Sequence, residues 1–141
     1  MERAKGHVFE HGWGEELVVG ALKYEEVRLL NMEDGRVLHS EIILKNAGRV
    51  RDVACGLDGA IYVVWEDRRS GINKVYASVS YDHGRFFSPD KLISSNVGFA
   101  AEHPKVATSR QGKNIAFVYQ QEDAHGVNHI YSRVKVTDFF D

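Results

Sequence analysis

Residues 59–67 read Gly59-Ala60-Ile61-Tyr62-Val63-Val64-Trp65-Glu66-Asp67, and residues 113–119 repeat their pattern as Lys113-Asn114-Ile115-Ala116-Phe117-Val118-Tyr119. Matched positions lie about 54 residues apart, as Ile61 and Ile115 show, and a Gly-x-Asn turn with a second apolar run follows each copy. A repeat of roughly 40–50 residues that holds several short strands is typical of β-propeller blades. The sequence therefore predicts a chain built from repeated blades.

Short apolar runs rich in β-branched and aromatic residues continue on both sides of this repeat, and glycine-containing turns separate them. We expect strands at residues 16–22, 26–32, 37–44, 50–55, 60–66, 74–81, 91–94, 105–108, 114–120 and 129–136. No stretch has the apolar stripe of a helix. The prediction is an all-β chain of four-stranded antiparallel blades, at about 7–46, 49–95 and 103–141, the third without its outer strand. Closed propellers have 4–8 blades, so the ring is incomplete unless the chain associates.

Composition limits the classes of function. The 141 residues are 43% hydrophobic and 27% charged, as in soluble globular proteins, and the net charge is −2. This balance gives no general attraction to nucleic acid or to an anionic membrane, and no apolar run is long enough to span a bilayer. The start lacks an apolar signal-peptide core. We expect the one cysteine, Cys55, to be a buried hydrophobic residue.

The turn at residues 80–87 fits the Asp-box pattern Ser-x-Asp-x-Gly-x-Thr-Trp/Phe through Ser80, Asp82, Gly84 and Phe87. The Asp carboxylate accepts turn N–H groups, the glycine adopts a positive φ, and the aromatic residue packs beneath the hairpin. With the flanking repeat, residues 59–136 resemble the sialidase-like BNR-repeat propellers. That resemblance implies a structural role for Asp82 and leaves open a glycan-binding module that uses Trp65 or Tyr119. Arg68 and Arg69 form no sialidase arginine motif.

The first half, about residues 9–64, resembles the C-terminal blades of the soluble glucose/sorbosone dehydrogenases, which are propellers that use pyrroloquinoline quinone (PQQ) and calcium. The similarity is carried by Trp13-Gly14-Glu15-Glu16-Leu17-Val18-Val19-Gly20-Ala21-Leu22-Lys23, Val27-Arg28-Leu29-Leu30 and Gly48-Arg49-Val50-Arg51-Asp52-Val53. The resemblance implies that Lys23, Arg49 and Arg51 face the cofactor, whose three carboxylates suit fixed cations. Arg49 and Arg51 also alternate as one strand face requires. A surface Lys23 and an Arg51–Asp52 ion pair are the alternatives.

The catalytic part of that site is not recognisable. The family's histidine base, its partner aspartate and its calcium loops belong to earlier blades, and none of the seven histidines falls in an equivalent motif. His7 and His11 are expected before the first strand, and His103 at the start of a blade. His125 and His129 lack a third ligand for a metal. We therefore assign no catalytic residue and no metal site.

The sequence thus favours a non-catalytic propeller module that acts in assembly or ligand presentation. The two resemblances meet at residues 58–65, which is consistent with a natural recombinant, a divergent dehydrogenase tail or an engineered splice. The module's expected partner is another copy, because two three-blade chains give six blades, or the missing blades of a larger propeller. The alternatives are a PQQ-dependent sugar dehydrogenase and a sialidase-like module with a carbohydrate ligand. No partner of nucleic acid or membrane is expected.

Overall fold

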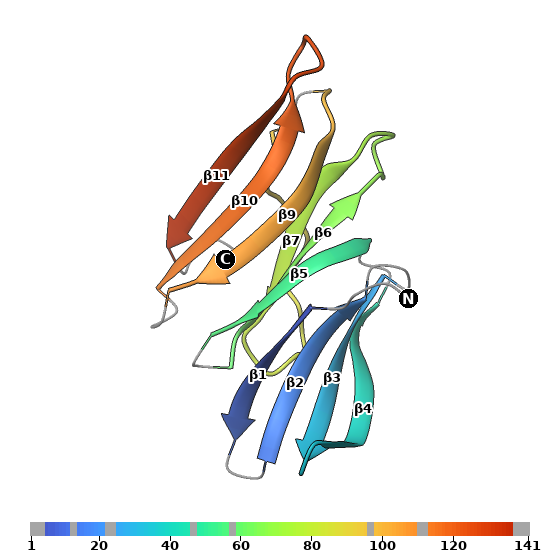
Figure 1. Cartoon of the computed structure of the whole chain (residues 1–141), viewed down its shortest axis with the longest axis vertical. Coiled ribbons are helices and arrows are strands. Elements are labelled where there is room, and N and C mark those ends of the chain that lie inside the picture. The colour runs from blue at the N-terminus through green and yellow to red at the C-terminus, as the bar shows by residue number, and fades with distance from the viewer. Residues whose placement is uncertain are drawn as a thin grey trace.

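The computed structural model describes residues 5–11, 14–21, 25–45, 48–56, 59–95, 98–109 and 113–136. These residues form strands and turns with no helix, which confirms the all-β prediction (Figure 1). Accordingly, no helix in these ranges is long and apolar enough to cross a membrane. The strands are β1 (Lys5–His11), β2 (Gly14–Ala21), β3 (Glu26–Glu33), β4 (Arg36–Lys45), β5 (Arg49–Cys55), β6 (Ile61–Asp67), β7 (Lys74–Ser80), β8 (Lys91–Leu92), β9 (Ala101–Thr108), β10 (Asn114–Glu122) and β11 (Asn128–Val136).

The strands form three antiparallel sheets that follow one another along the chain. We name them blade 1 (β1-β2-β3-β4), blade 2 (β5-β6-β7-β8) and blade 3 (β9-β10-β11). Strand β5, the first of blade 2, contacts β1 of blade 1 and β9 of blade 3, so the first strands of the three sheets are neighbours (Figure 1). Sheets that stack through their first strands form an open arc of propeller blades.

Blade 2 lies between the other two blades and buries both of its faces. Side chains alternate across a strand, so β6 sends Ile61, Val63 and Trp65 into a core shared with blade 1, and Tyr62 and Val64 into a core shared with blade 3. The first core also holds Val18, Val27, Leu29, Val50 and Val53, and the second also holds Val75, Ala77, Val79, Ile115, Phe117 and Tyr119. This double burial explains why residues 61–65 are uniformly apolar.

The structure differs from the predicted strands at β1, β8 and β9. His7 and His11 belong to β1 and do not precede the first strand, so that prediction is wrong. His103 lies inside β9, which begins at Ala101, and the outer strand of blade 2 contains only Lys91–Leu92. Each segment mixes polar and apolar residues without clear alternation, and pairing with a neighbouring strand places it in a sheet.

Candidate functional site

Arg49 and Arg51 lie at the start of β5, the strand that contacts both neighbouring blades. Arg49 is exposed, and the register places it opposite Glu66 of β6. The pairing of β5 with β6 shifts by one residue between Val50 and Asp52, which makes Arg51 the extra residue of a β-bulge. Such bulges re-aim side chains, and Arg51 also reaches Glu66. The third predicted residue, Lys23, lies outside the described residues.

Glu66 joins Arg51 to blade 3. Its Oε1 lies 2.9 Å from the Arg51 NH2 group, and its Oε2 accepts a 2.7 Å hydrogen bond from the backbone N–H of His103 in β9. Glu66 is only 2% exposed, whereas the side chain of Arg51 is partly exposed. A buried carboxylate requires such partners. The Nε group of Arg51 is buried and has no hydrogen-bond partner among the described residues. Arg51 therefore keeps one unused donor beside its ion pair.

A second buried carboxylate ties β5 to β9. Asp52 Oδ2 accepts a 3.0 Å hydrogen bond from the backbone N–H of Val106, and Oδ1 accepts one of 2.9 Å from Val53. The sequence also allowed an ion pair between Arg51 and Asp52. In the structure, Arg51 forms an ion pair with Glu66. Two acceptors on blade 2 thus bind backbone donors of blade 3, and they hold the two strands in one register.

A small polar cavity opens next to Arg49, where blade 1 meets blade 2. Its volume is about 250 Å³, and its lining is Glu25, Gly48, Arg49, Glu66, Asp67 and Arg68. Gly48 has a φ of 117°, and a Cβ there would lie 2.8 Å from the Glu66 carbonyl oxygen and would overlap the Trp65 ring. Only glycine allows this close approach of the backbone. The cavity therefore exposes the Arg49 guanidinium beside charged and backbone polar groups.

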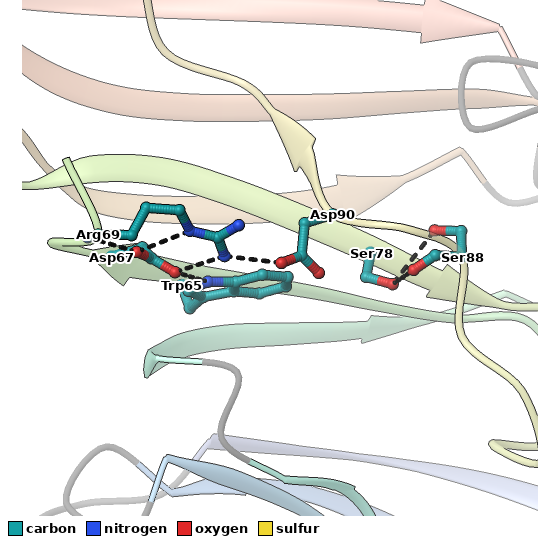
Figure 2. A network of polar contacts seen from close by, with 6 residues as sticks. All are labelled: Trp65, Asp67, Arg69, Ser78, Ser88 and Asp90. Atoms are coloured by element: carbon teal, nitrogen blue, oxygen red, sulfur yellow. Dashed lines mark hydrogen bonds and ion pairs between the residues drawn. The ribbon is translucent and has the colours of Figure 1, made fainter.

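The end of β6 is held by the network in Figure 2. Arg69 donates hydrogen bonds to Asp67 and to Asp90, the latter at 2.6 Å from its NH2, and its guanidinium lies 4.2 Å from the centre of the Tyr76 ring. Trp65 Nε1 donates to Asp67. Burial acts to raise the pKa of Asp67, but the bonds from Arg69 and Trp65 outweigh it and lower that pKa. This arginine therefore serves the hairpin.

The turn at residues 80–87 is closed by its own side chains. Asp82 Oδ1 accepts hydrogen bonds from the Phe86 N–H at 2.9 Å and from the Ser80 hydroxyl at 2.8 Å, which hold the pKa of Asp82 below its usual range. Gly84 has a φ of 86°, and its N–H donates to Ser80 Oγ. Phe87 packs against the core between blades 1 and 2. These contacts serve the turn; the relation to Asp-box and BNR families stays a prediction.

Other candidate positions show no site. Trp65 and Tyr119 are buried, so neither offers an open ring to a sugar. Asp123 Oδ2 forms a 2.7 Å hydrogen bond with His129 Nε2, and this bond lowers the pKa of Asp123. Across the ranges that the structure describes, no three His, Cys, Asp or Glu side chains gather as a metal site would require. The functional candidates are therefore Arg49, Arg51 and Glu66.

Sequence reasoning missed Glu66 as part of this group. The sequence contained a signal for it, because Glu66 is a charged residue directly after the apolar residues 61–65, and charged residues are rarely buried without a partner. Its partner in blade 3, the His103 N–H, could not be read from the sequence.

The model of a protein family described as Glucose / Sorbosone dehydrogenase matches residues 1–74. This range is more than half of the 141 residues and contains Lys23, Arg49, Arg51 and Glu66. A search of curated proteins finds no match to the chain.

Proposed function

The chain belongs to the glucose/sorbosone dehydrogenase family, and from this membership we propose that it presents the cofactor edge of a sugar-dehydrogenase propeller. In this proposal Arg49 and Arg51, together with Lys23, bind the carboxylates of PQQ. The chain by itself is a ligand-presenting module, because the histidine–aspartate base that the family resemblance implies is not recognisable in its sequence.

One observation carries the proposal: the two arginines at the start of β5 have guanidinium donors for which the described part of the chain shows no acceptor. Arg51 holds Glu66 through NH2, while its buried Nε has no partner among the described residues. Arg49 is exposed in the cavity lining, and the described residues offer it no ion-pair partner. An orphaned guanidinium donor is costly unless an acceptor arrives, and a carboxylate binds a guanidinium through two parallel hydrogen bonds.

The charges around the two arginines are mixed. Arg49, Arg51 and Glu66 together carry one net positive charge, whereas the rest of the cavity lining adds Arg68 and the acidic residues Glu25 and Asp67. In this proposal the anion is bound by direct hydrogen bonds from the two guanidinium groups and not by the net charge of the cavity. Glu66 fixes the Arg51 guanidinium and limits its rotamers, which reduces the entropy lost when a ligand binds. PQQ, when bound, supplies the acceptor for the hydride that leaves a sugar. The residues of this chain hold and orient that group.

A PQQ titration followed by absorbance and equilibrium dialysis tests the proposal. Arg49→Ala removes a side chain whose loss leaves no buried partner unpaired, and Arg51→Lys keeps the charge near Glu66 but removes the Nε donor. Losing one charge-assisted hydrogen bond, worth about 1.5–3 kcal/mol, weakens binding by about 10- to 150-fold. The matched control is Arg36→Ala, an exposed arginine of β4, which should bind as the unaltered chain does.

Two results would overturn the proposal. One is the absence of saturable PQQ binding, with or without calcium. The other is binding that weakens equally in Arg49→Ala and Arg36→Ala, because this would show attraction by overall charge instead of by the β5 edge.

A further inference from the structure

Arg68 lines the same cavity as Arg49, where blade 1 meets blade 2. It directly follows β6 and is exposed, as Arg49 is. The register pairs Arg49 with Glu66, so Arg68 lies two positions beyond that pair, at the diagonal distance that long side chains can span. Among the described residues, neither of the two guanidinium groups has a hydrogen-bond or ion-pair partner. The cavity therefore brings together two arginines whose donors are available to a ligand.

The next residue, Arg69, shows which contacts an arginine makes when it stabilises this turn. Arg69 donates hydrogen bonds to Asp67 and Asp90, and its guanidinium lies over the Tyr76 ring. Within the described part of the chain, the side chain of Arg68 has no comparable contact, and only its backbone carbonyl accepts a hydrogen bond, from Gly71. The structure thus separates two neighbours that the sequence presents as one pair: Arg69 serves the hairpin, and the Arg68 side chain does not.

The cavity lining also contains three carboxylates, and two of them are already paired within the protein. Glu66 binds Arg51, and Asp67 binds Arg69. The third, Glu25, is exposed and has no partner among the described residues. The groups left for a ligand are therefore two guanidinium groups and one carboxylate. A guanidinium binds a carboxylate through two parallel hydrogen bonds, whereas a carboxylate accepts hydrogen bonds from hydroxyl or ammonium groups.

We propose that this cavity binds a small dicarboxylate that also carries a hydroxyl or ammonium group. Arg49 and Arg68 each bind one carboxylate, and Glu25 accepts a hydrogen bond from the hydroxyl or ammonium group. The volume limits the size of the ligand, because about 250 Å³ is less than the roughly 300–1,000 Å³ of sites for drug-sized molecules. The inference shares Arg49 with the proposed function, but it does not require that PQQ binds.

Three four-carbon acids separate the contributions of these groups. Malate has two carboxylates and a hydroxyl group, succinate lacks the hydroxyl group, and β-hydroxybutyrate lacks the second carboxylate. Binding is measured by NMR titration of the isotope-labelled chain at constant pH and ionic strength. The unaltered chain should bind malate at least about 10-fold more tightly than β-hydroxybutyrate, because the second carboxylate adds a charge-assisted hydrogen bond. Malate should also bind more tightly than succinate, because only malate offers a donor to Glu25.

The ratio of the malate and β-hydroxybutyrate affinities identifies the role of each arginine. Arg68→Gln and Arg49→Gln should each bring this ratio close to one, because a single guanidinium is left for either ligand. A variant that only disturbs the fold weakens both ligands and leaves the ratio as it was. Glu25→Ala should remove the preference for malate over succinate. The matched control is Arg36→Gln, an exposed arginine of β4, which should change neither the affinities nor their ratio.

Several results would overturn the inference. They are the absence of saturable malate binding, an affinity for malate no higher than that for succinate or β-hydroxybutyrate, and an affinity ratio that Arg68→Gln leaves unchanged. The PQQ titration gives a separate answer. A chain that binds malate through Arg49 and Arg68 but does not bind PQQ supports this inference and refutes the proposed function, and a chain that binds PQQ but not malate does the reverse.

Discussion

The substitution Glu66→Gln tests the link between the candidate site and blade 3. Glutamine keeps the size of the side chain but replaces one acceptor oxygen with an NH2 donor. Either Arg51 NH2 or the His103 N–H then faces another donor, at positions now 2.9 Å and 2.7 Å from the carboxylate. A buried group without a partner costs about 1–3 kcal/mol, and a broken buried ion pair costs about 3–5 kcal/mol. Arg51 is partly exposed and can regain water, so we expect a loss of about 2–4 kcal/mol.

The free energy of unfolding is measured by urea denaturation, followed by tryptophan fluorescence and circular dichroism at one protein concentration. For a chain of this length the loss corresponds to a Tm lowered by roughly 6–14 °C. The control is Glu41→Gln on β4, which is exposed and should change stability by less than about 0.5 kcal/mol. If Glu66→Gln costs no more than Glu41→Gln, the carboxylate does not bridge Arg51 and β9 in a buried setting, and the reasoning fails.

Two smaller predictions concern packing between blades. Gly84 and Gly71 both have positive φ, of 86° and 95°, but a Cβ on Gly84 would lie 2.7 Å from Ile43 Cδ1 of blade 1, whereas one on Gly71 would meet nothing within 4 Å. Each change to alanine should cost about 1–2 kcal/mol of backbone strain, and Gly84→Ala a further 1–3 kcal/mol or so from overpacking; equal losses in denaturation would contradict this contact. Burial raises the pKa of the Cys55 thiol to about 12, so at pH 8 a thiol reagent should label the folded chain at least about 100-fold more slowly than the urea-unfolded chain. Labelling of the folded chain at the rate of a free thiol would show that Cys55 is accessible.

The strands of blade 2 were predictable because their signals are local. Residues 61–65 are apolar and all β-branched or aromatic, and the register of the hairpin that follows them depends on a short turn. The repeat then predicted β10 and β11, since the same local pattern returns at Asn114–Glu122 and Asn128–Val136. These features need no information about which sheet packs against which.

The strand β1 and the partner of Glu66 depend on contacts that the sequence does not display. Lys5–His11 has two adjacent apolar residues among charged and histidine residues, and only its pairing with β2 places it in a sheet. His103 donates to Glu66 across 37 sequence positions, from a residue whose φ of 56° is uncommon outside glycine. A pattern of period two predicts neither a bulge nor the direction of a backbone N–H group at a blade junction.

Two β-bulges, one in blade 2 and one in blade 3, lie beside the two groups that contact the Glu66 carboxylate. The register of β5 with β6 shifts between Val50 and Asp52, and that of β10 with β9 shifts between Val118 and Gln120, beside His103. The first shift brings Arg51 to one oxygen of Glu66, and the second lies where the His103 N–H reaches the other. Blade 3 lies beyond residues 1–74, the range that matches the dehydrogenase family. Even so, the His103 N–H of blade 3 donates a hydrogen bond to the Glu66 carboxylate that binds Arg51. Because the Glu66 carboxylate that contacts Arg51 also accepts the hydrogen bond from the His103 N–H of β9, we expect the position of Arg51 to depend on how blade 3 stacks on blade 2.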